Sequence, residues 1–187
     1  MKDAPRKIIA LDIGNVCVSI HPERVIARMK LFPTPEILGV SAKLECGLIS
    51  EREWLDFFHE KTRRRFSDDE MIDAWNLIIG ETLPGMSAAG RAALRSGYGF
   101  VFLSDVSRFH LTECRRKCEF FHLALDGVYS FDVGAQKPSK KMYREFERRH
   151  GRPCVYFDDR ADNIEAARGL GWNAVRFRCA SDFVLPE

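Results

Sequence analysis

The sequence lacks a long apolar run, an internal repeat and an excess of charge of either sign. Nothing in its 187 residues approaches the roughly 18 continuous apolar residues that span a bilayer, so we expect no membrane-spanning segment. Lys plus Arg number 29 and Asp plus Glu number 27, and this near-balance offers no broad surface for nucleic acid or an anionic membrane. No secretory signal is visible, which favours a cytoplasmic protein.

Cysteine is present, but its spacing predicts neither disulfides nor a zinc site. None of the six cysteines forms a CxxC pair, and most lie in apolar surroundings, which indicates reduced thiols. His110, Cys114 and Cys118 share one face of an expected helix and could hold a metal. Leu111 and Phe121 complete an apolar stripe with the two cysteines, so we favour core packing for this face.

Short apolar segments alternate with amphipathic ones along much of the chain. Strands are expected at residues 7–13, 98–103, 128–133, 154–157 and 174–178. Helices are expected at residues 87–95, 107–121, 138–150 and 161–170. Strands that alternate with helices predict an α/β fold with a doubly wound parallel sheet, in which ligands bind beyond the carboxyl ends of the strands.

A helical stretch interrupts this alternation after the first strand. Ser50 with Glu53, and Ser67 with Glu70, have the spacing of capping boxes, which open helices. Apolar residues recur at helical spacing after each box, and after the second they extend as far as Ile79.

The interruption divides the chain into two expected domains. We expect a helical insert at residues 18–83 and a core domain formed by residues 1–17 and 84–187. Both ends of the insert then lie beside the carboxyl end of the first strand, where it can act as a lid.

Polar residues follow four of the predicted strands, where this fold places ligands. They are Asp12 after the first strand, Ser104 and Asp105 after the second, Lys137 after the third, and Asp158 and Asp159 after the fourth. Converging carboxylates repel one another unless a hard cation lies among them, and Mg²⁺ prefers such oxygen ligands. A carboxylate can attack phosphorus as a nucleophile, while a hydroxyl and an ammonium hold phosphoryl oxygens. The set therefore predicts phosphoryl-transfer chemistry.

Four motifs carry a resemblance to a known family: LDIGNV at 11–16, LSD at 103–105, QKPSKKMY at 136–143 and YFDDRADNIEAARGLG at 156–171. Through them the chain resembles the phosphatase-like branch of the haloacid dehalogenase (HAD) superfamily. The resemblance implies a Rossmann-like fold with a helical C1-type cap. It implies Asp12 and Lys137 as catalytic residues, with Asp12 as the nucleophile and with Ser104, Asp105 and Lys137 at the phosphate. It also implies Mg²⁺ held by Asp12, Asp158, Asp159 and the backbone carbonyl of Gly14.

Two positions depart from the family pattern. Most phosphatases of this family carry a second Asp two residues after the nucleophile, which protonates the leaving oxygen, but this chain has Gly14. A positioned acid/base is typically worth about 10²–10⁴ in rate. The D-x-G-N form resembles a branch of sugar-phosphatase-like members. Asp105 stands where similar proteins usually carry Asn, and its carboxylate is unfavourable near phosphate unless it points away, for example to cap the next helix.

These observations favour a Mg²⁺-dependent phosphatase that hydrolyses a small phosphorylated metabolite, such as a sugar phosphate, through an aspartyl-phosphate. One alternative is a degenerate member that binds a phosphorylated ligand or a partner protein without efficient turnover. Another is a metal-free 2-haloacid dehalogenase, which needs no acid at Gly14 but leaves the paired Asp158 and Asp159 without a purpose. Substrate choice is expected to depend on the inner face of the cap, including the turn at residues 46–50.

Overall fold

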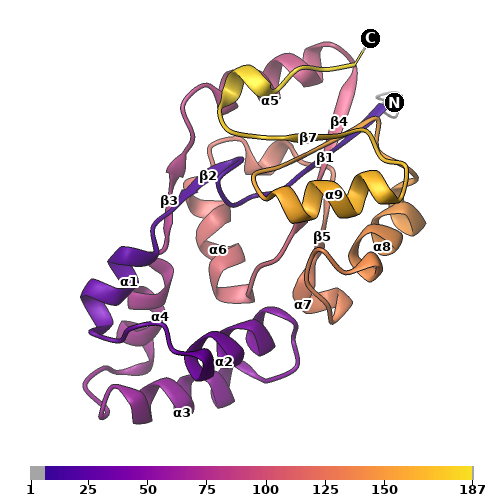
Figure 1. Ribbon diagram of the computed structural model, residues 1–187. Coiled ribbons are helices and arrows are strands. Elements are labelled where there is room, and N and C mark those ends of the chain that lie inside the picture. Colours follow the sequence, from indigo (N-terminus) through magenta and orange to yellow (C-terminus); the bar gives the residue numbers. More distant parts are fainter. Residues whose placement is uncertain (1–6, 187) are drawn as a thin grey trace.

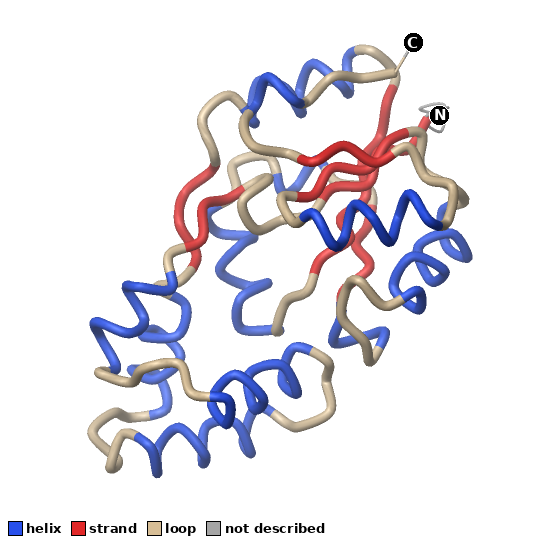
Figure 2. The backbone as a smooth tube through the Cα atoms, in the orientation of Figure 1, coloured by secondary structure: helices blue, strands red, loops and turns tan. Residues whose placement is uncertain are grey.

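The computed structural model describes residues 7–186, and their centre is one parallel sheet (Figures 1 and 2). Its five strands have the spatial order β5-β4-β1-β6-β7. Their bounds are β1 Lys7–Leu11, β4 Tyr98–Ser104, β5 Asp126–Tyr129, β6 Val155–Asp158 and β7 Ala174–Arg176. Every pair of neighbouring strands is parallel, which confirms the predicted sheet.

The central strand β1 is apolar on both faces because helices cover both. Ile9 packs into one hydrophobic cluster together with residues of α5 and α6, whereas Ala10 packs into a second cluster together with residues of α8 and α9. The helices of the core are α5 Met86–Arg95, α6 Arg108–Lys117, α7 Ser130–Val133, α8 Lys140–His150 and α9 Ala161–Gly169, with short 3₁₀ helices at Phe121–Leu123 and Ala180–Asp182. Helices on both faces make the sheet doubly wound.

Four further helices, which we call the cap, form a separate group between β1 and α5 (Figure 1). They are α1 Pro22–Met29, α2 Pro35–Glu45, α3 Glu51–Lys61 and α4 Asp68–Asn76. Both predicted capping boxes are present, at the start of α3 and of α4. The cap has its own hydrophobic cluster, in which Trp54 stacks on Phe58 and both rings pack at a tilt against Trp75.

A two-stranded antiparallel sheet connects the cap to the core, and the sequence did not predict it. β2 is Val18–Ile20 and pairs with β3, Ile79–Thr82. The predicted helix that extends as far as Ile79 is therefore wrong at its end, because α4 stops at Asn76 and Ile79 begins β3. Three- and four-residue strands are too short to show a period of two.

The predicted strand at residues 128–133 is also wrong in its second half. The strand ends at Tyr129, and Ser130–Val133 form the helical turn α7, which Gly134 closes with a positive φ. The Ser130 hydroxyl accepts a hydrogen bond from Val106 N at 2.9 Å and donates to Glu45 O at 2.5 Å. These long-range bonds favour the turn over a longer strand, and no local sequence signal reports them.

Within residues 7–186, no helix combines sufficient length with sufficient apolar character to cross a bilayer.

Candidate active site

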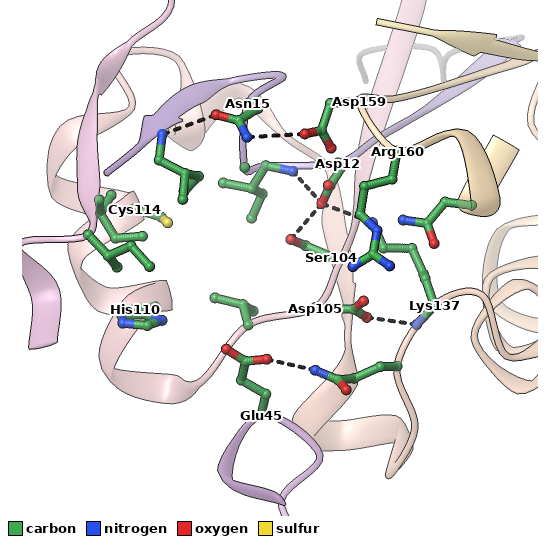
Figure 3. A pocket seen from close by; sticks show the side chains of 18 residues that line it. Asp12, Asn15, Glu45, Ser104, Asp105, His110, Cys114, Lys137, Asp159 and Arg160 are labelled. Carbon is green, nitrogen blue, oxygen red and sulfur yellow. Dashed lines mark hydrogen bonds and ion pairs between the residues drawn. The ribbon is translucent and has the colours of Figure 1, made fainter. Parts of the chain in front are cut away.

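A pocket of about 370 Å³ lies beyond the carboxyl ends of β1, β4 and β6, between the sheet and the cap. All of the predicted site residues except Asp158 line it, and Asp158 lies buried directly beside it. Figure 3 shows Asp12, Ser104, Asp105 and Lys137 gathered on one wall, and Glu45 extending toward them from the cap. The fold thus brings together residues that are up to 147 positions apart, from Asp12 to Asp159.

Asp12 occupies the floor of this pocket, immediately after β1. Its side chain is only 7% exposed, and Oδ1 accepts hydrogen bonds from Ile13 N and Ser104 Oγ, both at 2.8 Å. Burial raises the pKa of Asp12 to about 7, although the nearby Lys137 opposes this effect. A carboxylate that is partly desolvated and held by fixed donors is well placed to act as a nucleophile.

Lys137 is the buried cation of the site. Its Nζ donates to Leu103 O at 2.9 Å and to Asp158 Oδ2 at 2.7 Å, and it lies 3.0 Å from Asp12 Oδ1. Burial lowers the pKa of Lys137, but the charges of Asp12 and Asp158 outweigh burial and hold the pKa above its usual value. The ammonium is therefore a fixed positive charge between two carboxylates.

Asp158 and Asp159 have different surroundings despite being neighbours. Asp158 is fully buried, and its two oxygens accept from Lys137 Nζ, Tyr156 Oη, Arg160 N and Asn163 Nδ2. Burial raises the pKa of Asp158, but Lys137 outweighs it and the pKa falls below its usual value. Asp159 is partly exposed to the pocket.

Three carboxylates converge closely enough to hold a metal ion. Asp12, Asp158 and Asp159 each have one carboxylate oxygen that lies within 4.8 Å of the other two. Within residues 7–186, no other group of three Asp, Glu, His or Cys side chains is as close. An all-oxygen set of this kind suits Mg²⁺. Because four donors already occupy Asp158, we expect Asp12 and Asp159 to be the direct ligands and Asp158 to orient them.

Gly14 and Asn15 form the turn between β1 and β2. Gly14 lines the pocket without presenting an acid, and a Cβ added there would lie 3.2 Å from Ile20 Cγ1. Asn15 has a positive φ of 52°. Its side chain donates to Asp159 Oδ2 at 3.1 Å and accepts from Ile20 N at 3.2 Å, so it ties the turn to a candidate metal ligand. Asn15 belongs to the first motif, but nothing in the sequence indicates this role.

Asp105 does not cap the following helix. Ser107 is the N-cap of α6, and its hydroxyl accepts from His110 N at 3.2 Å. Asp105 Oδ1 instead accepts from Lys137 N at 3.0 Å, so it fixes the loop that carries the lysine. Burial raises the pKa of Asp105, and the carboxyl lines the same pocket.

The cap contacts the core through the end of α2. Gln136 Nε2 donates to Glu45 Oε2 at 2.6 Å, and Glu45 also receives the Ser130 hydroxyl on its backbone carbonyl. Gly47 lies so close to Phe131 O that a Cβ would approach to 2.5 Å. Glu45 lines the pocket, whereas the turn at residues 46–50, which we expected there, does not.

Cys114 and Cys118 pack in the core, as expected, whereas His110 of the same helix face lies against the cap. His110 is buried and stacks on Trp75 with ring centroids 5.0 Å apart. Burial lowers the pKa of His110 to about 4, so the ring is neutral at physiological pH. Both cysteines are buried in the hydrophobic cluster on the α5/α6 side of the sheet, and no metal group includes them among the described residues.

Sequence reasoning missed two residues that position Asp158. Tyr156 reads as one apolar residue of a buried strand, and nothing in the sequence shows that its hydroxyl donates to a carboxylate two residues later. Asn163 lies within the fourth motif, but its two hydrogen bonds to Asp158 depend on the first turn of α9.

No protein-family model matches the chain. Its structure is similar to that of a HAD family enzyme from Bacteroides thetaiotaomicron, with a TM-score of 0.82 and 21% identity over 91% of this chain and 92% of that one. A structure of the same enzyme in complex with magnesium and inorganic phosphate gives a TM-score of 0.78 at 20% identity, over 91% and 93% of the two chains. A predicted HAD-like family hydrolase from Porphyromonas gingivalis gives a TM-score of 0.76 at 20% identity, over 92% and 91%. The chain therefore has the fold of the HAD family enzymes.

Proposed function

We propose that the protein is a Mg²⁺-dependent phosphatase of the HAD superfamily that hydrolyses a small phosphorylated metabolite. The observation that carries the proposal is the position of Asp12, whose carboxylate lies between a buried lysine and a three-carboxylate group at the floor of the pocket. The HAD family enzyme of Bacteroides thetaiotaomicron, which has the same fold, binds magnesium and inorganic phosphate. That complex supports the choice of both metal and ligand.

The residues present fit a magnesium ion. Asp12 and Asp159 would hold it, with the Gly14 carbonyl as a further oxygen ligand and Asp158 as the orienting carboxylate. When bound, the ion would offset negative charge on the phosphoryl oxygens. The chain contributes the other positive charge through Lys137.

The chemical steps of this chain follow from the geometry of Asp12. Its carboxylate attacks phosphorus, the bond to the leaving oxygen breaks, and a covalent aspartyl-phosphate forms on Asp12. Ser104 Oγ and Lys137 Nζ, which contact Asp12 at 2.8 and 3.0 Å, are placed to donate to the phosphoryl oxygens during transfer. Water then hydrolyses the acyl phosphate, releases inorganic phosphate and regenerates Asp12.

Removal of divalent cations is expected to silence hydrolysis. An excess of chelator should abolish turnover of 4-nitrophenyl phosphate, and added Mg²⁺ should restore it, because the paired carboxylates otherwise repel the phosphate dianion. Initial rates with and without chelator measure this effect. Hydrolysis that persists in chelator would contradict the metal dependence in the proposal.

The absence of an acid at Gly14 should be visible in the choice of leaving group. Gly14→Asp is expected to raise kcat/KM for alkyl phosphates about tenfold or more, and to change it little for 4-nitrophenyl phosphate, whose leaving group needs no proton. The new Cβ needs only a small shift of the Ile20 side chain.

A Gly14→Asn variant of similar size is the matched control for Gly14→Asp, because it adds no acid. Equal effects on both classes of ester would mean that proton transfer does not limit this site. The same assay addresses the non-catalytic alternative that Gly14 suggests, since a binding protein would hydrolyse neither ester.

A further inference from the structure

A second cavity, of about 270 Å³, lies inside the cap next to the catalytic pocket. Helices α1, α2, α3 and α4 all contribute to its walls. Glu45, Ile78 and His110 line both this cavity and the catalytic pocket, so the two spaces adjoin at these three residues. The organic group of a phosphomonoester whose phosphate lies at Asp12 would reach this cavity past these three residues.

The walls of the cap cavity are apolar. Val25, Met29, Phe58 and Trp75 are among the residues that line it, and all four belong to the hydrophobic cluster of the cap. The catalytic pocket also has apolar lining residues, namely Ile13, Ile20, Ile78, Ile79 and Val106. An apolar surface therefore extends from the floor of the catalytic pocket into the cap.

The cap cavity offers few polar groups and no cationic side chain among the described residues. None of the described residues that line it is Lys or Arg. The hydroxyl of Ser41, a lining residue, already donates to Ile37 O at 2.8 Å. His110 is neutral and Glu45 is an acid, so neither offers a positive charge to an anionic substrate. The indole N–H of Trp75, which has no partner within residues 7–186, is a single further donor in this wall.

We infer that the substrate is a phosphomonoester of an alcohol with an aliphatic or aromatic hydrocarbon group, and that this group occupies the cap cavity while the phosphate lies at Asp12. The inference rests on the proposed phosphatase function and names its substrate class. In the net reaction the ester and one water give the free alcohol and inorganic phosphate. A sugar phosphate, the example of a substrate given above, would place several hydroxyls against a mostly apolar wall.

Binding of n-alkylphosphonates from methyl to octyl, measured by calorimetry with Mg²⁺ present, tests the inference without turnover. The dissociation constant is expected to fall about three- to fourfold for each added methylene until the cavity is full, which corresponds to burial of one CH₂ at a time. Octylphosphonate should also change tryptophan fluorescence through Trp75, whereas methylphosphonate should not, and Trp75→Phe should remove the change.

Ala42→Phe supplies the matched variant, because Ala42 lines the cap cavity from α2, whereas the neighbouring Lys43 faces solvent. Ala42→Phe should flatten the dependence on chain length and leave methylphosphonate binding intact, and Lys43→Phe should change neither. If the Ala42→Phe variant does not fold, the fluorescence measurement on the unaltered protein still tests the inference.

Two results would overturn the inference in distinguishable ways. Phosphonate affinity that does not depend on chain length, together with Mg²⁺-dependent hydrolysis of sugar phosphates, would refute the substrate class and leave the phosphatase function in place. The absence of any phosphonate binding, together with the absence of hydrolysis of any phosphomonoester, would refute both.

Discussion

Asp12→Asn is expected to lower the rate of 4-nitrophenyl phosphate hydrolysis by more than about 10³-fold, because an amide cannot form the acyl phosphate. An activated ester such as 4-nitrophenyl phosphate gives the clearest test, because its leaving group needs no acid. The loss of hydrolysis rate then reports the role of the nucleophile alone. Steady-state kinetics with saturating Mg²⁺ measure this loss. A rate within tenfold of the unaltered protein would refute Asp12 as the nucleophile.

The fold of the Asp12→Asn variant should remain intact. The amide oxygen can still accept from Ile13 N and Ser104 Oγ, and the variant removes a carboxylate whose pKa is already raised to about 7 by burial. We therefore expect a change of less than about 1 kcal/mol in the free energy of unfolding, measured by urea titration. Asp162→Asn is a matched control, because Asp162 lies on the solvent side of α9 and pairs with Arg160.

The sheet and the convergence of the site could be predicted because both follow from strand ends. A buried parallel strand reads as an apolar run, and the residue after it must lie at the carboxyl edge of the sheet. Asp12, Ser104, Lys137 and Asp159 could therefore be placed together from their order in the chain alone. Their positions directly after the predicted strands were sufficient, and no distance between them had to be known.

What the sequence could not reveal depends on contacts between distant segments. The hydrogen bond from Gln136 to Glu45 joins residues 91 positions apart and helps to hold the end of α2 at the pocket. The roles of Tyr156 and Asn163 depend on the rotamers of buried side chains around Asp158. Short strands such as β2 form because β3 pairs with them, so their own residues carry little signal.

Lys137→Met is expected to be costly for both stability and activity, since the lysine is the buried counter-charge of two acids. Nζ contacts Asp158 Oδ2 at 2.7 Å and Asp12 Oδ1 at 3.0 Å, and it satisfies Leu103 O at 2.9 Å. Removal of one partner from a buried ion pair typically costs about 3–5 kcal/mol, because the remaining charge stays buried and unpaired. Catalysis should also fall by about 10²–10³-fold through loss of a donor to the phosphoryl group.

A double-mutant cycle can show whether the lower stability of Lys137→Met comes from charge repulsion or from lost packing. If repulsion between Asp12 and Asp158 causes the loss, adding Asp12→Asn to Lys137→Met should recover part of the free energy of unfolding, although Asp12→Asn alone gains little. Urea titrations in chelator measure all four proteins without a bound cation. Lys140→Met is the control, because Lys140 is exposed at the start of α8 and its substitution should change stability by less than about 0.5 kcal/mol.

Additive effects of Lys137→Met and Asp12→Asn would mean that the lysine acts by packing rather than by charge. A coupling of about 1 kcal/mol or more would instead show that the charge of Lys137 holds Asp12 and Asp158 together before any substrate binds.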